Sequence, residues 1–182
     1  RPNCPLMAAR PVSQRGMRTD PPPSVPSAID VMPAATEAAA PALEPPGVYP
    51  ALLYASEVGE LESAITSCDG SAAARARVHA EMGDVAWTAA IWALDGRALA
   101  PEAFPDARPD KFPSPRTCQA LLVRTLAVIC GYEQRLMRDG EYARGAPYVV
   151  NVVFEALATL ACFYGSDLQS VLRANLAKLA AR

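Results

Sequence analysis

Histidine is almost absent from this 182-residue chain, and cysteine is sparse. The sequence has one histidine, His79, and five cysteines that are odd in number, widely spaced and without any C-x-x-C pair. Zinc sites use closely spaced Cys and His ligands, so the sequence argues against a zinc site. Cys118, Cys130 and Cys162 fall in apolar helical runs, where a thiol acts as a small core residue. This use of cysteine indicates a reducing compartment.

Segments typical of export or membrane insertion are also missing. The basic N-terminus has no apolar signal-peptide core, and the most apolar stretch, 149–164, is shorter than the roughly 20 residues of a bilayer span. We therefore expect a cytoplasmic protein with no membrane partner. The chain begins with Arg1, which indicates either a fragment or a start misplaced upstream of Met17.

Excess charge of either sign is absent too. Lys and Arg number 17 and Asp and Glu 19, for a net charge of −2, which gives no overall attraction to a nucleic acid. Neither a Walker A loop nor a G-x-G-x-x-G segment occurs, so phosphate binding by this chain would have to rely on a metal ion.

The chain is rich in hydrophobic residues, at 51%, and many of them recur at helical spacing. Most of its 18 prolines lie in 2–50, and the sequence predicts a disordered Pro-rich tail at 1–27 followed by a single domain at 28–182. Apolar residues at helical spacing, separated by Pro, Gly and capping residues, predict an all-α bundle of five or six helices. The expected helices lie at about 27–40, 50–68, 71–95, 115–138, 147–164 and 168–179, with a loop at 99–113.

Local signals refine these boundaries. Ser114 before Pro115 predicts a capped helix start, and Ser166 to Gln169 has the form of a capping box. The β-branched residues of 147–164 leave a strand as the alternative for that segment.

Two pairs of carboxylates are the candidates for chemistry. Glu57 and Glu60 lie three residues apart on one expected helix, and Glu81 and Asp84 lie three apart on the next, at similar heights in the hairpin that the two helices form. Four converging carboxylates repel one another unless a cation holds them, and an all-oxygen cluster suits Mg²⁺ or Mn²⁺. The alternative is an ordinary solvated acidic surface.

A glycine lies within each pair. Gly59 and Gly83 each cost a helix about 1 kcal/mol relative to alanine. Such positions need a reason, which here is either a close helix approach or room for a ligand.

Three blocks of the sequence together resemble the MazG-type all-α nucleoside triphosphate pyrophosphohydrolases. They are YPALLYASEVGEL at 49–61, EMGDVAW at 81–87, and the Asp167-Leu168 pair followed by RANLAKL at 173–179. The family pattern is E-E-x-x-E, a spacer and E-x-x-D, and the spacer between Glu60 and Glu81 here is 20 residues. The resemblance implies that Glu57, Glu60, Glu81 and Asp84 are Mg²⁺ ligands. It also implies that Asn175 and Lys178 contact the nucleotide or its phosphates.

The chain departs from the family pattern in two places. Ser56 replaces the first Glu of the motif, which leaves open which group activates the attacking water; Glu57 and Glu60 are the candidates. The stretch at about 96–146 is extra relative to the family and includes a whole amphipathic helix, which we interpret as an insertion that either covers the site or builds an interface.

The function implied by the resemblance is Mg²⁺-dependent hydrolysis of (d)NTPs to (d)NMP and pyrophosphate, as a house-cleaning activity. The alternative is a catalytically inactive bundle that binds a nucleotide or a protein. The apolar faces of 115–138 and 147–164 predict a homodimer, in which the inserted helix either packs across the partner or takes its place.

Other residues are weaker candidates. Trp87 and Trp92 are expected in the core rather than stacked on a base, and His79 is expected on a helix surface. The remaining ones are polar or charged: Asn151 and Glu155 as hydrogen-bonded or interfacial groups, and Arg75 and Arg77 as a charged helix face.

Overall fold

The protein, as a computed structural model, is described for residues 48–95, 105–140 and 146–181. These ranges contain five helices and no strand, which confirms the all-α prediction and rules out the strand alternative for 147–164. The helices are α2 (Val48–Thr66), α3 (Ala72–Asp95), α4 (Pro115–Asp139), α5 (Ala146–Phe163) and α6 (Leu168–Ala180). The predicted tail at 1–27 and the predicted helix at 27–40 lie outside the described residues.

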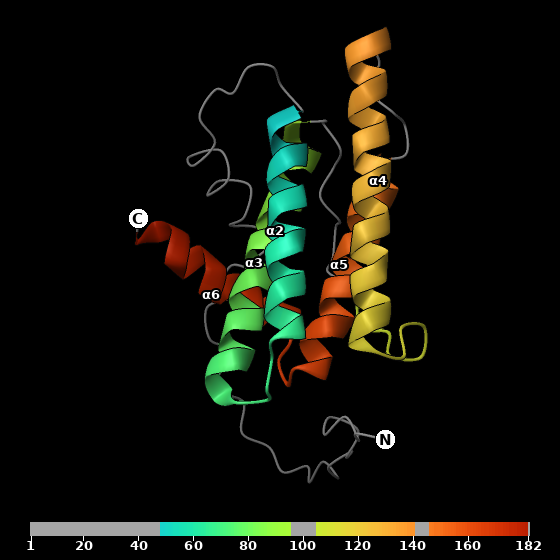
Figure 1. The fold of residues 1–182 in the computed structure, drawn as a ribbon. Helices are drawn as coiled ribbons and strands as arrows, with labels where there is room; N and C mark the ends of the chain where they lie inside the picture. The colour runs from blue at the N-terminus through green and yellow to red at the C-terminus, as the bar shows by residue number, and fades with distance from the viewer. Residues whose placement is uncertain (1–47, 96–104, 141–145, 182) are drawn as a thin grey trace, which may run out of the picture.

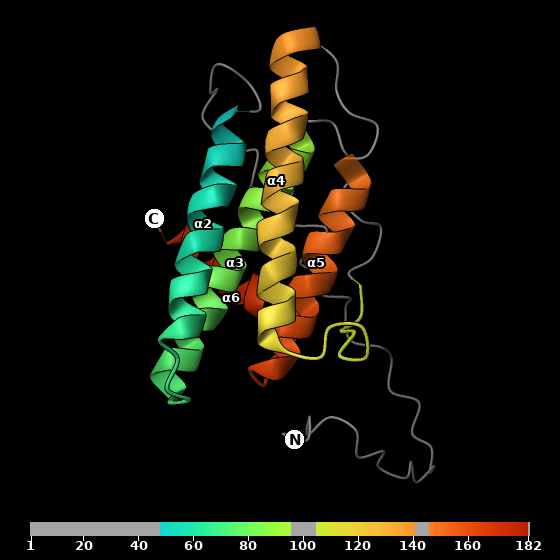
Figure 2. The same cartoon turned by 45° about the vertical axis from the view of Figure 1, so that its right-hand side comes forward.

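Four of the helices form a ring of neighbours (Figures 1 and 2). The short turn at 67–71 joins α2 to α3, which lie side by side and antiparallel, and α4 and α5 form the second pair. Contacts of α2 with α4 and of α3 with α5 close the bundle. The chain then bends by 100° between α5 and α6, so that α6 crosses the bundle and packs on α3 and α5.

The core lies inside this ring, and the periodic stripes of the sequence fill it. Every residue of the predicted α3 stripe is buried: Val78, Met82, Val85, Ala89 and Trp92. The helix α5 has the most continuous buried run, from Ala156 to Ala161, which explains its nearly unbroken apolar sequence.

Helix ends follow the local signals in most cases. Ser114 caps α4 by accepting a hydrogen bond from the Thr117 amide, and Gly140 ends the helix with a left-handed φ of 70°. The predicted capping box at the start of α6 is wrong in its capping residue. Asp167, not Ser166, caps that helix, and its carboxylate accepts from the Ser170 amide at 2.9 Å.

Helix α4, which belongs to the expected insertion, contributes directly to the core. Its Thr125 shares a buried hydrogen bond of 2.8 Å with Tyr54 of α2, and its buried Glu133 accepts from Trp92 Nε1 at 2.6 Å. The expectation that Cys130 is a core residue is wrong, because its position on α4 faces solvent. Whether 96–146 is an insertion stays a prediction, but α4 is an integral wall of this bundle.

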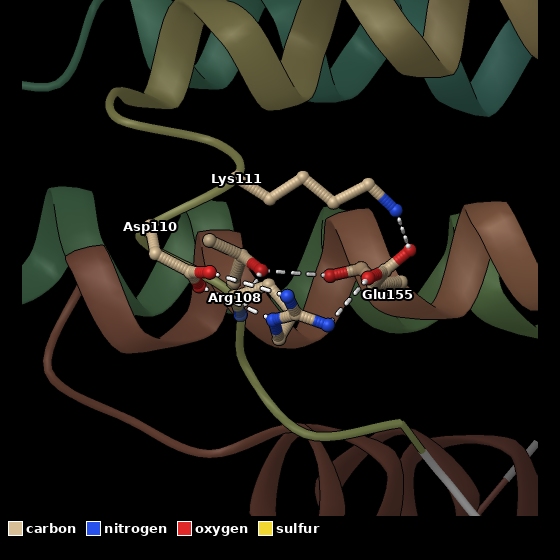
Figure 3. A network of polar contacts seen from close by, with 5 residues as sticks. Arg108, Asp110, Lys111 and Glu155 are labelled. Carbon is tan, nitrogen blue, oxygen red and sulfur yellow. Dashed lines mark hydrogen bonds and ion pairs between the residues drawn. The ribbon is translucent and has the colours of Figure 1, made fainter.

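The segment before α4 is fixed to α5 by polar contacts (Figure 3). Arg108 donates its amide to Thr159 Oγ1 at 2.8 Å, and Lys111 pairs with Glu155 at 2.8 Å. Glu155 therefore has the hydrogen-bonded role expected for it, and these contacts tie the segment before α4 to α5.

No single helix in the described ranges is both long enough and apolar enough to cross a membrane. The bent pair α5 and α6 meets the length and composition test only jointly.

Candidate metal centre

Three carboxylates from α2 and α3 come together. Glu57 projects from α2, and Glu81 and Asp84 project from α3 one helical turn apart. One oxygen of each lies within 4.8 Å of the others. The three side chains are half-buried, because the neighbouring residues Val58 and Met82 face the core. The two helices thus hold three acidic groups in one small cluster.

Glu60 lies apart from this cluster. Its side chain is exposed, and its Oε1 accepts a long hydrogen bond of 3.4 Å from Ser56 one turn earlier. It is still near enough for its charge to raise the pKa values of both Glu57 and Glu81. The structure therefore brings together three of the four expected ligands and leaves the fourth at the rim.

Helix α6 closes the cluster from the other side. Asn175 Nδ2 donates to Asp84 Oδ1 at 2.6 Å, and the ammonium of Lys178 forms an ion pair with Asp84 Oδ2. Asn175 is buried, and the Asp84 side chain is only 14% exposed. Both residues that the family resemblance implied as nucleotide contacts thus contact a carboxylate of the cluster.

Gly83 permits this contact. A Cβ at Gly83 would lie 2.7 Å from Asn175 Cβ, a distance that side chains do not tolerate. Gly59 has nothing within 4 Å of the equivalent position. Of the two reasons considered for these glycines, close helix approach applies to Gly83 alone, and the structure gives no explanation for Gly59.

The electrostatics of the cluster are those of crowded negative charge. Burial, followed by the charges of Asp84, Glu60 and Glu81, raises the pKa of Glu57 from 4.5 to about 7. Burial and the charges of Asp84 and Glu60 likewise raise the pKa of Glu81, while Lys178 and Arg77 lower it. A cation bound among these oxygens would reduce the repulsion between the ionised carboxylates.

The donor set fits a hard divalent cation. It offers carboxylate oxygens with neither sulfur nor imidazole among them, which is the ligand chemistry of Mg²⁺ and Mn²⁺. The three carboxylates are only partly buried, so solvent and ions can reach them. These residues suit the ion that the sequence led us to expect.

The weaker candidates take other places. Arg75 bonds the Gly70 carbonyl and Arg77 bonds Ser67, so both brace the turn between α2 and α3. His79 was expected to face solvent, but it is half-buried, and its Nε2 is buried without a hydrogen-bond partner in the described chain. Trp92 is a core residue as expected.

The two remaining candidates, Trp87 and Asn151, are not part of the carboxylate cluster either. Trp87, expected in the core, is half-buried. Asn151 is exposed on α5.

A separate pocket of about 220 Å³ lies between 105–107, α5 and the start of α6. Its lining has no basic side chain and includes Asp106 and Asp167, so it does not suit a phosphate.

The pairing of α6 with Asp84 is the feature that sequence reasoning missed. Asn175 and Lys178 are three residues apart and therefore share one face of α6, and Gly83 is the small residue that this face needs opposite it. Both features are visible in the sequence, but no local pattern indicates that this face of α6 packs against Gly83.

Comparisons with known proteins add no assignment. No protein-family model matches the chain, and neither a curated protein nor a solved structure matches it.

Proposed function

We propose that this protein is a Mg²⁺-dependent nucleoside triphosphate pyrophosphohydrolase, which converts (d)NTPs to (d)NMP and pyrophosphate. The observation that carries the proposal is the cluster of Glu57, Glu81 and Asp84, with oxygens within 4.8 Å of one another and Lys178 beside it. Carboxylates that hold a hard cation next to a basic side chain are a combination suited to a triphosphate.

Each residue of the site would have a distinct role. Glu57, Glu81 and Asp84 would hold the ion, and Asn175 orients Asp84 through its hydrogen bond. A bound Mg²⁺ would neutralise the negative charge that develops on the phosphoryl oxygens. Lys178 would approach the phosphate tail, and its ion pair with Asp84 supports this role.

In the reaction, the oxygen of a water molecule forms a bond to the α phosphorus. The bond between the α phosphorus and the oxygen that bridges it to the β phosphorus breaks. Pyrophosphate leaves with the bridging oxygen, and the proton of the attacking water passes to a carboxylate of the site or to solvent. Of the two candidates for orienting that water, Glu57 is favoured over Glu60, because Glu57 belongs to the cluster and Glu60 is exposed.

The test is pyrophosphate release from a panel of NTPs and dNTPs with Mg²⁺ or Mn²⁺, and with EDTA in their place. Glu81→Gln should abolish turnover, since it removes a ligand charge. Glu62→Gln is the matched control, because Glu62 is an exposed carboxylate on the same hairpin outside the cluster. Full activity of the Glu81 variant, or turnover in EDTA, refutes the proposal.

One observation favours the second candidate, a catalytically inactive nucleotide- or protein-binding bundle. The ion pair between Lys178 and Asp84 already compensates part of the charge of the cluster without a metal. If no nucleotide is hydrolysed with either ion, and the protein still binds one, this candidate replaces the enzyme.

A further inference from the structure

Lys178 is the positive charge that faces the whole cluster. It is ion-paired with Asp84, and its charge lowers the pKa values of Glu57 and Glu81 as well. Its positive charge therefore acts on all three carboxylates, and its direct contact is with Asp84.

The contacts of Asp84 show what a metal ion would meet. Oδ1 of Asp84 accepts from Asn175, and Oδ2 is paired with Lys178. A divalent ion coordinates carboxylate oxygens at about 2.0–2.6 Å, so an ion and an ammonium that share one oxygen would repel each other strongly. One of the two cations has to give way.

The two α6 residues differ in their freedom to move. Asn175 is 5% exposed and wedged against Gly83, whereas the Lys178 side chain is 37% exposed. A lysine side chain is a flexible four-carbon stem that can swing its ammonium into water while its helix stays in place.

We propose that Lys178 is a built-in counter-cation of the metal-free site, and that a divalent ion displaces its ammonium from Asp84. Once displaced, the ammonium is available to an anionic ligand, so metal binding precedes and prepares phosphate binding. This regulation rests on the proposed function, because it requires the carboxylates to bind a divalent ion.

The sequence allows a direct test. Lys111 and Lys178 are the two lysines of the chain. Lys111 is paired with Glu155 on α5 and belongs to a separate network, so it serves as an internal control in the same molecule. The experiment is brief amine acetylation of the full chain, with the ratio of labelled Lys178 to labelled Lys111 read by mass spectrometry. Samples contain Mn²⁺, Mg²⁺ or EDTA at matched ionic strength, and Mn²⁺ occupancy is measured separately from the free-ion electron paramagnetic resonance signal.

We expect the ratio to rise several-fold with Mn²⁺, in step with occupancy. If Mn²⁺ binds and the ratio does not change, the displacement is refuted and the proposed function stands. If Mn²⁺ does not bind at all, both are refuted.

A pair of variants gives a second measurement. Lys178→Met should bind Mn²⁺ about tenfold more tightly, because the competing charge is gone, whereas Lys111→Met should bind it as the wild type does. Unchanged or weaker binding by Lys178→Met overturns the proposal.

Discussion

Gly83 of α3 and Asn175 of α6 lie so close together that no side chain fits between them. A Cβ on Gly83 would be 2.7 Å from Asn175 Cβ, 3.0 Å from its Cγ and 2.9 Å from its Nδ2. Asn175 cannot turn aside, because it is buried and its amide is bonded to Asp84. The packing of α6 on the acidic cluster of Glu57, Glu81 and Asp84 thus depends on the absence of a side chain at Gly83.

Gly83→Ala should therefore destabilise the protein and loosen the site. Overpacking of this kind costs about 1–3 kcal/mol, more than the roughly 1 kcal/mol that alanine adds to a helix. We expect a lower free energy of unfolding in urea and weaker Mn²⁺ binding. Gly59→Ala is the matched control, because a Cβ there meets nothing within 4 Å. It should stabilise the protein by up to about 1 kcal/mol. Equal effects at the two glycines would contradict the close-approach explanation.

Asn175→Ala should weaken metal binding without removing a ligand. The substitution takes away the hydrogen bond that orients Asp84, and loss of such an orienting partner costs about tenfold in metal affinity. The free energy of unfolding should fall by about 2 kcal/mol, the usual contribution of a hydrogen bond to a charged group. Titration calorimetry with Mn²⁺ and urea unfolding measure the two effects. The exposed Asn151 on α5 supplies the control, and an Asn151→Ala variant that behaves like Asn175→Ala would show that the effect is not local.

The stability of the metal-free protein should depend on pH through Glu57. Its pKa is about 7 in the folded protein against an ordinary value of 4.5, so the folded state holds the proton more tightly than the unfolded state. The stabilising contribution is fully present below pH 4.5 and is lost as the pH rises through about 7. In EDTA, the free energy of unfolding should decline across that window. Glu57→Gln should flatten the decline, and saturating Mg²⁺ should remove it. A decline that persists unchanged in Glu57→Gln would assign it to other groups.

The helices were predictable because their signals are local. The stripe from Val78 to Trp92 repeats at the helical period, and capping and breaking residues mark the ends. The near approach of Glu57 to Glu81 also follows from sequence, since the turn length sets their heights in the hairpin. Glu60 differs because it lies one helical turn nearer the 67–71 turn than Glu57, whereas Asp84 lies one turn farther from that turn than Glu81, and Glu60 is left exposed.

The parts that the sequence did not predict are contacts between distant segments. A buried glutamate is rare, and Glu133 is buried with a partner, Trp92, that lies 41 residues earlier. The placement of Asn175 against Asp84 depends on the 100° bend before α6, which no periodicity encodes. Local sequence patterns predict the described helices. The angles between helices are set by side chains that meet only after packing.

Helix α4 has apolar side chains on its outer surface as well as in the core. Helix α4 turns its buried stripe toward its own bundle, yet it also exposes Val123 at 45% and Val128 at 43%. A second copy that packs on the outer side of α4 would cover such side chains. We therefore expect a homodimer, with a mass in sedimentation near twice 19.3 kDa at micromolar concentration.

A double variant, Val123→Glu with Val128→Glu, should shift that mass to 19.3 kDa without unfolding the chain, because both positions are exposed. Leu52→Glu on α2 is the control, since it places the same charge on an exposed apolar residue of another helix. A wild-type mass of 19.3 kDa would favour the other arrangement expected from the sequence. In that arrangement α4, which packs against α2 and α5, would occupy within one chain the place that a partner helix would take.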